Sequence, residues 1–289
     1  ALLNAWPMGF YQPSTLVEDA RRHGVEVRPI DVTTSAWECT LERVYGGPHG
    51  HAVRMGLRFV KGLGERERER LGGGPPPYAD LPDFARRAAP GERGLYTLPL
   101  HDALPICALS CFGLDRRDAL WAVRGLCAHA KDTLDLAPRG APEARFRSLA
   151  GHEEVSWDYA ASLHSARGHP MTRPRPALSA RGIPDAATLN AMPGRRRVTY
   201  VGMVICRQRP GTASGVTFMT LEDETGFVNL VVWRDVFERY AMVAKGAAVL
   251  EIEGPLQREH GVVHLVAERL AVPRLGAPPG EMPRSRNFH

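Results

Sequence analysis

The sequence predicts an α+β multidomain protein in which a helical region is followed by a small β-barrel. Residues 14–24 and 114–126 carry apolar side chains at helical spacing, with capping or helix-breaking residues at their ends. Residues 195–272 instead hold five runs rich in β-branched and aromatic residues, separated by turn-forming residues. Residues 128–192, which lie between these regions, are rich in proline and predict a linker with short helices.

Composition sets broad limits on the class of protein. A chain of 289 residues with 44% hydrophobic content can form two ordinary globular domains. The net charge of +5 is compatible with a polyanionic partner. The five cysteines form no CxxC pair, so we expect reduced thiols and a cytoplasmic protein without a zinc site. No apolar run approaches the roughly 20 residues that span a bilayer, so we expect no membrane partner.

The first residues predict a helix followed by a strand. Ser14 is the expected helix N-cap, and Gly24 follows a last turn that contains two arginines and a histidine. Residues 25–32 then have the composition of a short strand.

The segment from Val60 to Gly64 has the form of a helix-hairpin-helix turn. Gly62 and Gly64 allow a tight turn whose successive amides can point at one phosphate oxygen, and Arg58 and Lys61 add positive charge. Such a site binds the nucleic-acid backbone without reading its sequence. The alternative is a turn between two helices in which the glycines serve packing alone.

The second half predicts strands at 195–209, 216–221, 226–233, 247–256 and 262–270, with a helix at 235–243 after the third strand. Strand, strand, strand, helix, strand, strand is the order of the OB-fold, a five-stranded barrel that commonly binds oligonucleotides. Gly202 in the first strand would allow the sharp coiling that a small barrel needs.

Arginine and aromatic side chains mark a candidate nucleic-acid surface on this barrel. Arg207 and Arg209 flank a Pro/Gly-rich loop and are candidates for phosphate contacts. Phe218, Phe227 and Trp233 are candidates for base stacking. Of the three, Trp233, at a strand end, is the one most expected to be buried. The alternatives are that the aromatics belong to the core and that the arginines serve solubility. The acidic turn at 222–224 is expected to be solvated.

Short motifs over nearly the whole chain carry a family resemblance. They are residues 8–11, 19–32, 113–117, 119–123 and 156–159, followed by 207–213, 218–226 (Phe-Met-Thr-Leu-Glu-Asp-Glu-Thr-Gly), 266–270 and 285–289. Together they resemble the C-terminal region of the bacterial error-prone DNA polymerases, C-family enzymes related to the DNA polymerase III alpha subunit. The resemblance implies a translesion enzyme of DNA repair and damage-induced mutagenesis.

The resemblance also implies where the chemistry of the parent protein lies. In this family the palm, thumb and fingers precede a tandem helix-hairpin-helix region and an OB-fold. The palm carboxylates and their metal ions, expected to be Mg²⁺, would therefore lie upstream of Ala1. The parent would be a DNA-directed DNA polymerase, a nucleotidyltransferase. The fragment itself is predicted to be inactive, with no catalytic residue, metal ligand or cofactor of its own.

The predicted domains combine the pattern with the resemblance. They are residues 1–32 as the end of the fingers region, 33–127 as the helix-hairpin-helix region, 128–194 as the linker, 195–272 as the OB-fold and 273–289 as a C-terminal tail. Residues 95–106 do not fit the second hairpin motif expected there, and they resemble the translated read-through of a sequencing adapter. We hypothesise that residues 88–111 are an assembly artefact, which resequencing of the source locus would test.

The predicted role is an accessory DNA-binding region that contacts template–primer DNA and single-stranded template. One alternative is a stand-alone OB-fold protein that binds single-stranded nucleic acid. Another is a protein-interaction module that docks a recombinase, a sliding clamp or another mutagenesis protein. A flat response of oligonucleotide binding to salt would favour the second alternative, because phosphate contacts release counterions.

Overall fold

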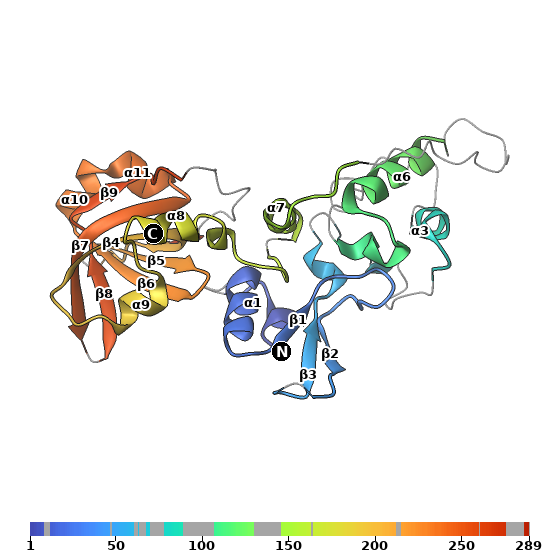
Figure 1. The fold of residues 1–289 in the computed structure, drawn as a ribbon, viewed down its shortest axis with the longest axis horizontal. Coiled ribbons are helices and arrows are strands. Elements are labelled where there is room, and N and C mark those ends of the chain that lie inside the picture. The colour runs from blue at the N-terminus through green and yellow to red at the C-terminus, as the bar shows by residue number, and fades with distance from the viewer. Residues whose placement is uncertain are drawn as a thin grey trace. The chain divides into compact units, whose positions relative to one another are not determined.

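The computed structural model divides the chain into two compact units (Figure 1). The first comprises Ala1–Met8 and Gln12–Arg167, and the second is built from Gly168–His289. The structure describes residues 1–8, 12–46, 48–60, 63, 68–69, 78–88, 107–129, 146–162, 164–211, 215–259, 261–275 and 286–288.

The first unit begins with a helix and a three-stranded sheet. Its elements are η1 (Leu3–Ala5), α1 (Pro13–Arg22), β1 (Glu26–Arg28), β2 (Thr40–Arg43), β3 (His51–Arg54) and η2 (Leu57–Phe59). The strand order is β1-β3-β2, with β1 parallel and β2 antiparallel to β3. The predicted boundary at residue 32 thus falls between paired strands of one sheet.

The predicted helix at residues 14–24 is confirmed as α1, but its predicted cap is wrong. Gln12 is the N-cap, and Pro13 is the first helical residue. Proline is favoured at that position because its φ angle is already helical and its missing N–H needs no partner. Ser14 is therefore buried inside the first turn instead of capping it.

The helical part of the first unit contains α3 (Leu81–Ala88), η3 (Cys107–Phe112), α6 (Arg116–His129) and α7 (Gly151–Ser162). Phe84, Leu109 and Val123 bury their side chains in one apolar cluster with residues of α1 and η2. Leu109 lies within the hypothesised artefact at 88–111, yet it is almost fully buried. Residues 95–106, which carry the resemblance to an adapter, lie outside the described residues, so the artefact hypothesis for residues 88–111 stays a prediction.

The second unit is a barrel with short helices packed on it. Its elements are η4 (Pro170–Thr172), α8 (Arg175–Ala180), α9 (Ala186–Ala191), β4 (Arg197–Gln208), β5 (Thr217–Asp223), β6 (Gly226–Val232), α10 (Arg234–Arg239), α11 (Ala241–Gly246), β7 (Val249–Glu259), β8 (Val262–Val266), β9 (Arg269–Ala271) and β10 (Arg286–Phe288). The predicted helix at 235–243 is thus two short helices that meet at Tyr240.

The sheet closes because β4 is long enough to pair twice. Its first half pairs with β7 and its second half with β5, with a bulge between Val204 and Cys206. The strands follow the order β4-β5-β6-β8-β7 and return to β4, which confirms the predicted OB-fold barrel. At Gly202, an added Cβ would lie 2.7 Å from Cε1 of Tyr200, so this position of the bent strand has no room for a side chain.

Two apolar layers lie on opposite faces of β4. Tyr200 and Val204 point into the barrel, where Leu221 and Ile252 are also fully buried. Val201 and Met203, on the outer face of β4, pack in a second cluster with residues of η4 and α8. The described part of the predicted linker that follows Gly168 is therefore packed against the barrel.

The predicted tail at 273–289 contributes a strand. β10 pairs in parallel with the last residues of β4, so that Asn287 lies opposite Arg207. Among the described residues, no helix combines the length and apolar character needed to cross a membrane.

Candidate nucleic-acid interface

The turn end of the β5–β6 hairpin is held by buried ion pairs. Arg175 of α8 donates to Asp223 at 2.9 Å and also pairs with Glu224. Asp223 is fully buried, and burial raises the pKa of Glu224. The prediction that this acidic turn is solvated is therefore wrong, because α8 covers it and supplies its counter-charge.

Backbone donors complete the environment of Asp223. The Ala186 amide donates to its Oδ2 at 2.8 Å, and the Thr225 amide and hydroxyl donate to its Oδ1. Phe227 lies at the same end, half-buried, and its carbonyl accepts from the Asn190 side chain of α9. The turn end thus fixes α8 and α9 to the barrel, and Phe227 is only partly accessible there.

The opposite end of the hairpin exposes aromatic side chains. Phe218 on β5 is 40% exposed, and Trp233, directly after β6, is 52% exposed. Phe218 pairs with Val231, and Trp233 follows Val231 by two residues, so both aromatics belong to the outer face of the hairpin. The expected burial of Trp233 is wrong, because β6 ends at Val232 and Trp233 is the extended N-cap of α10.

Arg207 does not lie on this surface. It is only 7% exposed, and its guanidinium donates to the carbonyls of Ala244 and Ala247 at the end of α11. Burial lowers the pKa of Arg207. The predicted phosphate contact through Arg207 is therefore corrected: the side chain neutralises the C-terminal end of a helix, where backbone carbonyls lack partners.

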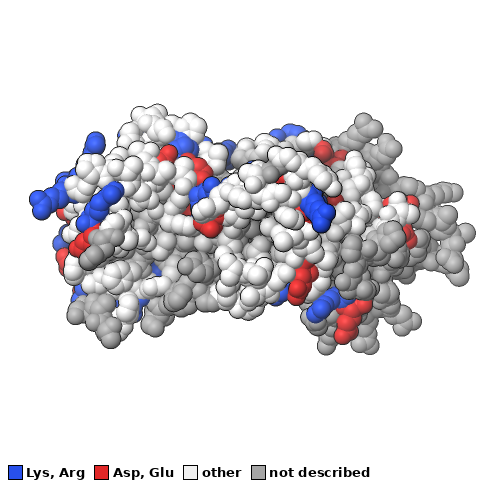
Figure 2. All heavy atoms as spheres, turned by 90° about the horizontal axis from the view of Figure 1, so that it is seen from below, with Lys and Arg blue, Asp and Glu red and all other residues white. Residues whose placement is uncertain are grey.

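Arg209, two residues later, reaches the surface. It is half-buried, and its Cζ lies 5.1 Å from the centre of the Phe237 ring, with Lys245 Nζ 6.0 Å from the same centre. Two cations thus lie near one ring at the end of β4, where the predicted phosphate-binding loop begins. Figure 2 shows basic side chains gathered at the barrel end of the molecule, with acidic side chains among them.

Of the residues predicted to form the DNA contact of the helix-hairpin-helix turn, the structure describes only Arg58. Arg58 donates to the carbonyls of Asn4 and Trp6, at 2.8 and 2.7 Å, and these bonds tie η2 to η1. Its role in holding the first unit together is clear, and a DNA contact from it stays a prediction. Lys61, Gly62 and Gly64 lie outside the described residues.

The acidic residues of the hairpin do not suit a metal ion. Within the described parts of both units, no group of three or more His, Cys, Asp or Glu side chains could hold one. Asp223 and Glu224 are committed to Arg175. The described residues therefore do not fit the Mg²⁺ of nucleotide transfer.

The chain contains two known domain types. Residues 24–119 match the family described as a helix-hairpin-helix motif, and residues 198–273 match the family described as an OB-fold nucleic acid binding domain. Both matches confirm the predicted order of the domains.

The particular relatives are polymerases. The chain is 45% identical to the error-prone DNA polymerase of Azoarcus sp. (strain BH72), a match that covers the whole of this chain and 27% of that protein. It is 42% identical to error-prone DNA polymerase 2 of Agrobacterium fabrum, over 93% of this chain and 25% of that protein. The error-prone DNA polymerase of Caulobacter vibrioides is 39% identical, in a match that covers 100% of this chain and 30% of that protein. The chain is thus homologous to one region of the error-prone DNA polymerases, and it spans between a quarter and a third of their length.

Proposed function

We propose that this chain is the C-terminal DNA-binding region of an error-prone DNA-directed DNA polymerase that acts in translesion synthesis. The observation that carries the proposal is the open end of the β5–β6 hairpin, where Phe218 and Trp233 expose their rings on the outer face of an OB-fold barrel. Aromatic platforms bind single-stranded bases with little sequence preference, since every base has a π-face.

The charge and position of the basic residues suggest different DNA contacts for the two units. Arg209 and Lys245 would contact the phosphates of a single-stranded template, and the turn at Lys61 with Gly62 and Gly64 would bind the template–primer backbone. Neither contact depends on a correct base pair, which suits synthesis past a lesion. Nucleotide transfer itself would use palm carboxylates and Mg²⁺ outside this chain, so the chain would bind DNA without extending it.

The test is a fluorescence-anisotropy titration of labelled oligothymidylate with the full chain over a series of salt concentrations. We expect binding that weakens with salt and that weakens further in the double variant Phe218→Ala/Trp233→Ala. Met242→Ala is the matched control, because Met242 is an exposed apolar side chain of α11 in the same unit.

Two results would contradict the proposal. Unchanged affinity of the double variant would remove the aromatic surface from DNA binding. Absent or salt-independent binding would favour a docking module for a protein, such as a recombinase, a sliding clamp or another mutagenesis protein.

A further inference from the structure

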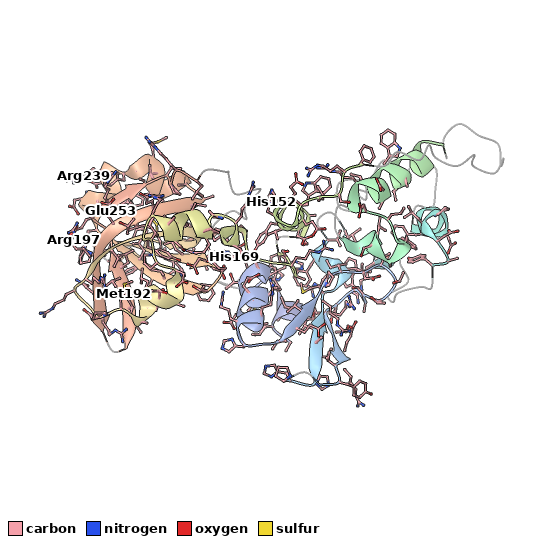
Figure 3. The ribbon with its side chains drawn as sticks, in the orientation of Figure 1. His152, His169, Met192, Arg197, Arg239 and Glu253 are labelled. Atoms are coloured by element: carbon pink, nitrogen blue, oxygen red, sulfur yellow. The ribbon has the colours of Figure 1, made fainter. Side chains whose placement is uncertain are left out.

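A cavity of about 280 Å³ lies on the barrel unit, and its lining includes no residue of the β5–β6 hairpin. One wall is the segment between α8 and α9, and the other is formed by β4 and β7. Figure 3 shows Met192, Arg197 and Glu253 along this side of the barrel. The volume is close to the lower limit of small-molecule sites, about 300 Å³, so the cavity has room for roughly one nucleotide unit.

The cavity has a largely polar, charged lining. Ile183 and Met192 add a small apolar area, and Ile183 belongs to the second apolar cluster on β4. Arg181, Arg196 and Arg197 reach the rim from two different segments. This lining suits an anionic ligand.

The acidic residues of the rim are already paired. Glu251 accepts from Arg181 at 2.8 Å, and Glu253 accepts from Arg269 at 3.0 Å. Arg197 pairs with Glu268, outside the cavity lining. Arg181 and Arg269 thus neutralise the two carboxylates of the rim, so these carboxylates repel an incoming anion less.

Arg196 is the rim cation that stays available. Among the described residues it has no ion-pair partner, and its side chain is exposed. Its backbone is fixed, because the Leu256 amide donates to the Arg196 carbonyl at 2.9 Å and the Arg195 amide donates to the Leu256 carbonyl at 2.7 Å. The exposed guanidinium of Arg196 thus projects from a backbone held by hydrogen bonds, and it can donate charge-assisted hydrogen bonds to an anion.

The backbone before Arg196 is strained. Arg195 has a φ of 70°, in the left-handed region that non-glycine residues rarely occupy. This turn lets residues 195–197 enter β4 with Arg196 and Arg197 both at the cavity. Strain of this kind is concentrated at binding sites, where the surrounding structure holds it in place.

We propose that this cavity binds the phosphate group of a nucleotide or of a nucleic acid, with Arg196 as its principal ligand. The identity of the anion rests on the proposed nucleic-acid function. The phosphate could belong to a nucleic-acid backbone that passes over β4 and β7, or to a free nucleotide. In both cases the site is separate from Phe218 and Trp233.

The experiment uses the full chain, with dAMP and labelled oligothymidylate as separate probes. Arg196→Ala should weaken binding of at least one probe about tenfold, the loss expected for one charge-assisted hydrogen bond. Arg196→Lys should restore part of it. Arg239→Ala is the matched control, since Arg239 is an exposed arginine of α10 that does not line the cavity.

Each outcome decides one point. Loss of dAMP binding assigns a free nucleotide, and loss confined to the oligonucleotide assigns a backbone phosphate. The proposal is overturned if neither probe responds to Arg196→Ala, or if Arg239→Ala has the same effect. Retained dAMP binding in a chain that fails to bind oligonucleotide would contradict the function proposed for the aromatic surface and leave the cavity site standing.

Discussion

The two ends of the β5–β6 hairpin differ in what covers them. At the turn end, Asp223 is enclosed by Arg175, by the Ala186 amide of α9 and by the Thr225 amide of the turn. At the other end, Phe218 and Trp233 expose large apolar surfaces to solvent. Charged residues are buried where the hairpin holds the unit together, and aromatic residues are exposed where a ligand can reach them.

Charged side chains are usually exposed and large apolar ones buried, and the hairpin departs from this rule at both ends. The departure distinguishes residues that stabilise the unit from residues that can bind a ligand. A buried charge is tolerated only with a partner and hydrogen bonds, and Asp223 has both. Neighbouring large apolar side chains left exposed mark an interaction surface. The predictions below each alter one end and ask whether stability or affinity changes.

The largest effect is expected at the turn end. Arg175→Ala leaves the Asp223 carboxylate buried without its counter-charge and should lower the free energy of unfolding of the barrel unit by about 3 kcal/mol. Denaturant titration measures this. Arg234→Ala, which breaks a solvent-exposed pair with Glu238, should change stability much less, because water and salt screen that pair. Equal losses of unfolding free energy in the two variants would show that burial does not make the Arg175–Asp223 pair more important for stability than an exposed pair.

Arg207→Ala should also act on stability. It leaves the carbonyls of Ala244 and Ala247 without their donor and should cost about 2 kcal/mol in the same titration. Because Arg207 is buried, the affinity of the folded variant for oligothymidylate should stay within about twofold of the parent chain. A large affinity loss without a stability loss would return Arg207 to the binding surface.

Trp233→Ala should act on affinity. Base stacking on an aromatic side chain contributes about 1–3 kcal/mol, so the dissociation constant for oligothymidylate should rise at least fivefold. Stability should change little, since more than half of the side chain is already exposed. A stable variant with the parent affinity would contradict a stacking role for this residue.

Arg209→Ala should give the smallest change. Loss of one phosphate contact should reduce the salt dependence of binding to single-stranded DNA, with the log–log slope less steep by about 0.7. Arg207→Ala is a matched comparison, because Arg207 is the second-last residue of β4 and Arg209 directly follows the strand. An unchanged slope would show that Arg209 makes no phosphate contact and only packs against Phe237.

Local patterns predicted the fold better than the site. Alternation and turn residues are enough to predict the order of the barrel strands, whereas the coiling predicted at Gly202 stays a prediction. The site depends on contacts between distant residues. The sequence around Glu222–Glu224 contains nothing to indicate Arg175, nearly fifty positions earlier, and Arg207 and Arg209 look alike until α11 is in place.

The sequence does contain a signal for the exposed position of Trp233. Asp235 and Arg234 follow it directly, and a polar start after an aromatic residue indicates a helix N-terminus at the surface. The strands at 40–54 were also missed, since their glycine-, proline- and histidine-rich connection hides the alternation. Lys61, Gly62 and Gly64 remain predictions.

The most direct measurement is photocrosslinking of an oligonucleotide that carries 5-iodouracil, followed by mass spectrometry of the crosslinked peptides. If the open end of the hairpin binds bases, crosslinks should fall on Phe218 or Trp233, and none should fall on the turn held by Arg175. Crosslinks in the barrel unit that avoid both aromatic residues would contradict this assignment of the nucleic-acid surface.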